Sequence, residues 1–398
     1  LPEAVRTSAA DAWERCEVKG SFDGSIDIRQ RASGADERHA KFVTRGVNFL
    51  ARGVPAELRV TQGALTIDGP TLGLRGVRVE ARCRDRRVGV LEADGSIALD
   101  PSGEQNLRGA WMIDDFASLL WPEVLDAANL ERISDLHDDW NPVGFAGGTL
   151  LVRRTSTGEP DWDIEVTHDG VLVGDPGGVP ISLSLVPGGH LAFGPDSIGV
   201  RGPSGDEPGL VGCLPGGEFA LDGVLATGPR GPAGGGSVHM RFDVGPIHQG
   251  VVRVLPQELA DALGTIELRA GNASSQDLRL LGWTQASPEP GLTGTIDLQD
   301  GSLRAGTTLS RIHAPFRIDA RGGRDYPVQI QLGCGEGTFL AGDRFFDHAD
   351  GLLRLTEGAK QIDIVDLQSD LYGGRACASA VIGGPANDWR LDLRIDGA

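Results

Sequence analysis

Short blocks of sequence recur along the chain in the same order, about 120 to 135 residues apart. Gly95–Asp100 and Gly217–Asp222 agree at four of six positions. Because the matches keep their order, they predict a chain built from repeated structural units. The remaining blocks are two pairs shared by the first two units and three segments that end in Asp: Val43–Val47 with Val166–Val171, Gly53–Leu58 with Gly178–Leu183, and Trp111–Asp114, Met240–Asp243 and Trp389–Asp392.

The repeat predicts three units, at 1–119, 120–253 and 254–398, each opened by a short α-helix. Proline is favoured at the first helical position, and each unit starts with one. The chain begins at an expected helix start and stops just after a unit-ending strand, so we expect it to be a piece of a longer protein. The prolines and the expected helices are Pro2 with 2–15, Pro122 with 116–135, and Pro256 with 255–263.

Apolar and polar residues alternate elsewhere in runs of five to eight, bounded by Gly, Asp and Pro. Such alternation is typical of strands with one buried and one wetted face. Because the strands follow one another with short connections, an antiparallel meander is the simplest pairing. Asp94–Gly95 and Asp300–Gly301 have the sequence of tight hairpin turns. The predicted fold is therefore mainly β, an elongated antiparallel sheet that could fold onto a second sheet, close into a barrel or curl into a groove.

The apolar positions of these strands are the candidate binding residues. They could form a dry core, in which the sheet folds onto another layer, or line a groove that a ligand fills. The sequence leaves both interpretations open. The candidates are Ile26, Ile28, Leu58, Val60, Leu65, Ile67, Val77, Val79, Leu183, Leu185, Ile296, Leu298, Phe316, Ile318, Val328, Ile330, Leu391 and Leu393.

Charge and motif content argue against several function classes. The net charge of −19 disfavours nucleic acid, since phosphates require clustered basic residues. The one basic run, Arg82–Arg87, is interpreted as a strand end or turn. Gly333–Gly337 is interpreted as close strand packing or a bulge within a strand, and not as a phosphate loop. Asp135–Asp139 is interpreted as a polar helix end and not as a calcium loop.

No enzyme is expected, because the sequence contains no catalytic or metal-binding motif. We accordingly expect no catalytic residues, no metal and no cofactor. The five cysteines have no metal spacing, and their odd number does not describe a disulfide framework. No apolar run in the sequence is long enough to span a bilayer, and no charged-then-apolar segment in it reads as a signal peptide.

The last third of the chain resembles the repeats of AsmA-like proteins, which include the TamB branch. The shared rhythm is a strand that starts with Gly, an Asp-Gly step and a later Gly-Gly strand, and weaker forms of it occur throughout the chain. The residues that carry the resemblance are Gly294–Leu303, Ile312–Phe316, Gly335–Phe339 and Tyr372–Ala378.

This resemblance implies a curled antiparallel sheet with a hydrophobic groove that moves phospholipid or another lipid between the inner and outer membranes. It implies a periplasmic location in the cell envelope, a membrane anchor outside this chain and possible envelope protein partners. The groove would shield acyl chains and leave the headgroup in water. The alternative function is a structural or adhesive extracellular β-solenoid or scaffold.

Overall fold

A computed structural model defines the protein as a succession of antiparallel β-strands. It describes residues 16–30, 36–51, 56–83, 86–98, 103–114, 143–154, 161–168, 172–175, 180–205, 207–229, 231–245, 270–282, 284, 291–305, 307–320, 328–356, 361–383 and 389–396. These residues divide into two units, Leu1–Gly174 with His190–Pro195, and Asp175–Gly189 with Asp196–Ala398. We call them unit 1 and unit 2.

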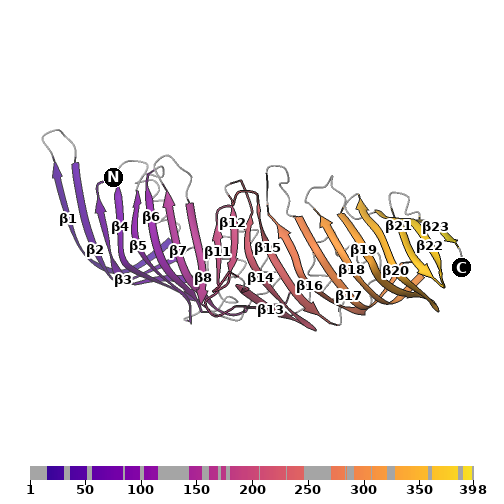
Figure 1. Ribbon diagram of the computed structural model, residues 1–398. Coiled ribbons are helices and arrows are strands. Elements are labelled where there is room, and N and C mark those ends of the chain that lie inside the picture. Colours follow the sequence, from indigo (N-terminus) through magenta and orange to yellow (C-terminus); the bar gives the residue numbers. More distant parts are fainter. Residues whose placement is uncertain are drawn as a thin grey trace. The chain divides into compact units, whose positions relative to one another are not determined.

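Unit 1 is an open antiparallel sheet whose strands lie side by side in chain order (Figure 1). Strand β11 pairs with β8, and β9 is joined to the chain before β7 by a single bridge between Val143 and Val173. No pairing joins β1 to β11 among the described strands. The strands are β1 (Cys16–Gln30), β2 (Asp36–Ala51), β3 (Ala56–Asp68), β4 (Thr71–Cys83), β5 (Arg86–Ala98), β6 (Gln105–Ile113), β7 (Ala146–Arg154), β8 (Asp161–His168), β9 (Leu172–Gly174) and β11 (His190–Gly194).

Unit 2 is a second open antiparallel sheet, and its strands β14 to β23 again pair in chain order. One edge of β14 is shared, since β13 pairs with its first half and β12 with its second half. The strands are β10 (Ile181–Leu185), β12 (Ser197–Arg201), β13 (Leu210–Leu214), β14 (Gly217–Ala226), β15 (Gly236–Val244), β16 (Ala270–Leu281), β17 (Gly291–Ala305), β18 (Thr307–Ala320), β19 (Val328–Ala341), β20 (Arg344–Thr356), β21 (Gln361–Leu371), β22 (Gly374–Gly383) and β23 (Trp389–Asp396).

The mainly β, antiparallel prediction is confirmed, and the described residues contain no helix. All three predicted helices, at 2–15, 116–135 and 255–263, lie outside the described residues, as does Asp135–Asp139. The described strands also run longer than the predicted runs of five to eight residues, up to 16 in β2. Nothing in the structure tests the three predicted unit boundaries.

The prediction of hairpin turns at the two Asp-Gly steps is wrong. Strand β5 runs through Asp94–Gly95, and β17 runs through Asp300–Gly301. Gly95 has φ +134°, which favours Gly, and Asp300 has φ +51°, which Asn and Asp also adopt. This backbone is used here for a β-bulge within a strand, because the register on either side of Gly301 shifts.

A row of such bulges crosses unit 2 from β17 to β21. In β19, Ile330 and Leu332 lie on one face. The next residues of β19 on that face are Gly337, which pairs with Ala349, and Phe339, which pairs with Phe346. The odd spacing between Leu332 and Phe339 would place them on opposite faces of a regular strand. The residues of Gly333–Gly337 absorb this change, which confirms the prediction of a bulge there.

The bulge row makes Gly333→Ala a test of the fold. Gly333 has φ +72°, and a Cβ at this position would lie 2.0 Å from the carbonyl oxygen of Ala349. We expect the substitution to cost about 1–3 kcal/mol or more and to lower the melting temperature of unit 2 by several degrees. Gly205→Ala is the matched control, because its added Cβ meets no atom within 4 Å. Equal melting temperatures of the two variants would contradict the bulge geometry.

Candidate functional site

The strand registers of unit 1 place a continuous row of apolar side chains on one face of the sheet. Direct cross-strand neighbours on that face run from β3 to β11 without a charged residue in between. We call this the apolar face of unit 1. Its two central rows are Val60–Val79–Leu91–Trp111–Gly148–Val166–Leu191 and Leu65–Leu74–Gly95–Leu107–Val152–Trp162.

Bulges keep both rows on the same face. Val60 and Leu65 are five residues apart in β3, and register shifts lie between them at Gln62. Strand β6 has a regular register on both sides, and it carries Leu107 and Trp111 at an even spacing. Leu107 belongs to one row and Trp111 to the other, and both lie on the same face of β6. The two rows therefore lie on the same face of the sheet.

Unit 2 has an apolar face of the same kind. Two rows cross its last seven strands, and the rows are tied together by β22, whose register with β23 is regular. Farther back, Leu183 pairs with Gly212, which pairs with Phe219 and then with Phe242 on the same face. The two rows are Gly294–Ile318–Ile330–Leu353–Ile364–Ala380–Leu391 and Ile296–Phe316–Leu332–Gly351, the latter continuing through Leu367, Ala378 and Leu393.

The opposite face of each sheet carries ion pairs between its strands. Arg78 Nη1 lies 2.5 Å from Glu92 Oε1 in unit 1, and Arg241 Nη2 lies 3.1 Å from Asp222 Oδ1 in unit 2. Ion pairs at exposed positions contribute only about 0–1 kcal/mol each. These pairs therefore mark the wetted face of the sheet and do not account for its stability.

The basic run falls where the sequence predicted, with Cys83 ending β4 and Arg86 starting β5. Arg87 Nε donates a hydrogen bond to Asp114 Oδ2 over 2.7 Å. This bond and the negative charge of Asp114 raise the pKa of Arg87 above its ordinary value. Arg87 is thus already engaged by a carboxylate of its own sheet.

Every predicted binding residue occupies a register position on the apolar face of its unit. For example, Ile26 pairs with Ala40, which pairs with Ile67, and Val328 pairs with Leu355. The side chains of Ile28, Val328, Leu391 and Leu393 lie outside what the structure describes, although their backbone pairings are known.

Burial divides the remaining candidates. Val77, Leu185, Leu298 and Ile318 are buried, whereas 65% of Ile26 and 45% of Leu58 is exposed. Most of the others are half-buried, as are Leu91, Trp111 and Leu150 beside them. Each apolar face therefore contains a buried middle and leaves part of its hydrocarbon open to solvent or to a ligand.

The sequence analysis missed several residues of the two apolar faces. Trp111, Leu107, Leu150 and Ile164 lie there in unit 1, and Leu371, only 2% exposed, lies there in unit 2. The signal that could have found those of unit 1 is simple alternation, because β6, β7 and β8 are regular across these positions. Leu371 lies beyond the bulge at Asp366, where the alternation changes phase.

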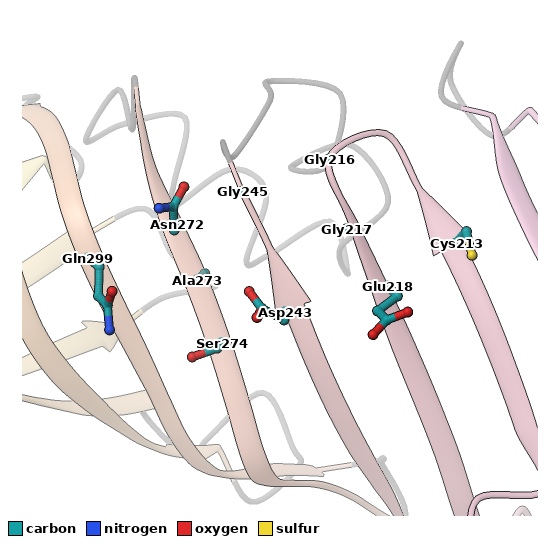
Figure 2. A pocket seen from close by; sticks show the side chains of 10 residues that line it. All are labelled: Cys213, Gly216, Gly217, Glu218, Asp243, Gly245, Asn272, Ala273, Ser274 and Gln299. Atoms are coloured by element: carbon teal, nitrogen blue, oxygen red, sulfur yellow. The ribbon is translucent and has the colours of Figure 1, made fainter.

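A separate pocket of about 650 Å³ lies in unit 2 on the opposite, polar face (Figure 2). Glu218 and Asp243 face one another across β14 and β15, and Asn272 faces Gln299 across β16 and β17. Paired carboxylates repel one another mildly at such a site. Within the described strands, no group of three or more His, Cys, Asp or Glu residues could hold a metal ion.

Four of the cysteines have described surroundings, and none of these four forms a disulfide: Cys83, Cys213, Cys334 and Cys377. Cys334 lies in the β19 bulge with φ +44°. Partial burial and then the negative charge of Asp350 raise the pKa of its thiol, which lowers its reactivity at neutral pH. This environment is the reverse of the one that activates a nucleophilic cysteine.

Comparison with protein-family models finds no match, and comparison with curated proteins and with solved structures finds none either. In the part of the chain that the structure describes, no helix is both long enough and apolar enough to cross a bilayer.

The burial pattern of the apolar face predicts unequal costs for one substitution at two positions of unit 2. Ile318 is 5% exposed and Ile395 is 41% exposed, and both face the same side. We expect Ile318→Ala to cost about 2–4 kcal/mol and Ile395→Ala less than about 1 kcal/mol, because only the first leaves a cavity. Denaturant unfolding of both variants measures the difference. Similar losses would show that the middle of the apolar face is no better packed than its end.

Proposed function

We propose that the chain is a non-enzymatic lipid carrier, in which the bent sheets form grooves and hold acyl chains on their apolar faces. The observation that carries this proposal is the uninterrupted run of apolar cross-strand neighbours from one strand to the next in both units. A hydrocarbon chain could move along such a run without passing a buried charge.

The energetics favour an apolar ligand over solvent on these faces. Each methylene transferred from water to an apolar surface contributes about 0.8 kcal/mol. In the described part of each unit, every element belongs to a sheet, and many residues of the apolar face stay half-buried. A ligand with long acyl chains would bury this remaining surface and would need no catalytic group.

The proposal extends to the cellular setting that the resemblance to AsmA-like proteins implies. The chain would act in the periplasm of a double-membraned bacterium, anchored to the inner membrane by regions outside this sequence, and would carry phospholipid toward the outer membrane. Envelope proteins would be its protein partners. Repeat-opening helices would belong to the same arrangement.

The scaffold or adhesive function remains the alternative. The described pairings are antiparallel, whereas the rungs of a β-helix pair in parallel, and this difference disfavours the solenoid form of that alternative. A scaffold function would not require the half-buried apolar faces of the two units.

Lipid retention by two neighbouring variants of β6 tests the proposal. Leu107 lies on the apolar face, and Asn106 is exposed on the opposite face. We expect full-length Leu107→Asp, purified without detergent, to lose at least about tenfold of its bound lipid, because a carboxylate on the apolar face disfavours acyl chains. Asn106→Asp adds the same charge and should keep its lipid. Lipid is quantified by extraction and mass spectrometry.

Thermal melting separates loss of binding from loss of folding. Ile26→Asp provides a second variant at an exposed position of the apolar face, and Ser25→Asp is its control on the opposite face. If wild-type protein carries no lipid, or if both control variants lose as much lipid as the test variants, the lipid-carrier function is wrong.

A further inference from the structure

The apolar face of unit 1 carries a guanidinium at one end. Arg154 is the last residue of β7, two residues beyond Val152 on the same face, and its cross-strand neighbour is Gln105 of β6. Arg86, which pairs with Cys83 at the start of β5, also has a register position on that face, but it is exposed. The adjacent Arg153 points to the opposite face, where it pairs with Asn106 and Asp161.

The Nε atom of Arg154 is buried and has no hydrogen-bond partner in the described part of the chain. Other buried polar groups of the apolar faces are satisfied. Ser275 Oγ donates a hydrogen bond to the Thr295 carbonyl over 2.6 Å, and Ser369 Oγ donates one to the Asp347 carbonyl over 3.0 Å. A buried N–H donor without an acceptor costs free energy, and an anion that binds from outside the chain would supply the missing acceptor.

We propose that Arg154, assisted by the Gln105 amide, binds the phosphate of a phospholipid whose acyl chains lie on the apolar face of unit 1. This inference rests on the proposed lipid-carrier function and adds the headgroup to it. A guanidinium offers a planar set of donors that matches two phosphate oxygens at once. The bound phosphate would supply the acceptor that Nε lacks.

The dimensions of β7 agree with this placement. From Arg154 to Ala146 the strand covers about 26 Å, at roughly 3.3 Å per residue. One acyl chain spans about half of a hydrocarbon core of about 30 Å. A phospholipid held at Arg154 can therefore lay its chains over Val152 and Leu150, and over Leu107 on β6, without leaving the apolar face.

Headgroup dependence in three proteins tests the inference: the full-length wild type, Arg154→Gln and Arg153→Gln. Three probes separate the sources of binding energy, namely phosphatidylglycerol, diacylglycerol with the same acyl chains, and inorganic phosphate. We expect the wild type to bind phosphatidylglycerol at least about tenfold more tightly than diacylglycerol. Arg154→Gln should remove this preference and leave diacylglycerol binding unchanged, and Arg153→Gln should behave as the wild type.

The possible outcomes point to different conclusions. If the wild type binds neither lipid, the lipid-carrier function itself fails. If it binds both lipids equally, or if Arg154→Gln keeps the preference, the carrier stands and the role of Arg154 is wrong. If inorganic phosphate binds in an Arg154-dependent way and phosphatidylglycerol does not, the site takes free phosphate and the lipid headgroup assignment is overturned.

The melting temperature of lipid-free protein distinguishes a ligand-binding Arg154 from one that only stabilises the fold. In delipidated protein, Arg154→Met removes the buried Nε donor that has no acceptor. It keeps most of the hydrocarbon stem, so we expect the melting temperature of unit 1 to stay the same or rise. Added phosphatidylglycerol should then stabilise the wild type more than Arg154→Met. A lower melting temperature of delipidated Arg154→Met would show that the guanidinium has partners in the protein and would overturn the inference.

Discussion

The fold depends on keeping the apolar side chains of long, bent strands on one face. Alternation in a strand has a period of two, so any local distortion by one residue would move the rest of the strand's apolar set to the other side. Register shifts occur in neighbouring strand pairs within each unit: in β3–β4 and β4–β5 of unit 1, and in every pair from β17 to β22 of unit 2. The strands therefore bend together, and the two apolar faces stay continuous.

A sheet of this kind is stable only if its apolar face is covered in part. Curvature and neighbouring side chains bury the middle residues, such as Leu298 and Ile318, and they leave positions such as Leu58 open. In the proposed function this open surface is the binding site. The hydrophobic free energy of burying it is then gained when a ligand binds and not when the chain folds. The unpartnered Nε of Arg154 is similar. It destabilises the lipid-free protein, and in the proposed lipid complex the phosphate would relieve this destabilisation and so strengthen binding.

The sequence predicted what depends on local alternation. Ile296 with Leu298, and Phe316 with Ile318, were placed correctly on a common face because no bulge separates the members of each pair. The Asp-Gly steps were misread as turns, since a left-handed backbone conformation serves hairpins and bulges equally and only the strand partners tell them apart. Arg154 could not be found from sequence, because it stands beside Arg153 and only the register with β6 assigns the two to different faces.

Nearly all of the described strands pair with the strand that comes next in the chain, the main departures being β8 with β11, β10 with β13 and β12 with β14. Pairing between sequence neighbours requires only short loops to close, which keeps the entropic barrier of each step small. The chain can consequently assemble hairpin by hairpin as it leaves the ribosome. Gain or loss of a whole hairpin would lengthen or shorten such a sheet without disturbing the remaining registers, a route by which related chains could evolve to different lengths.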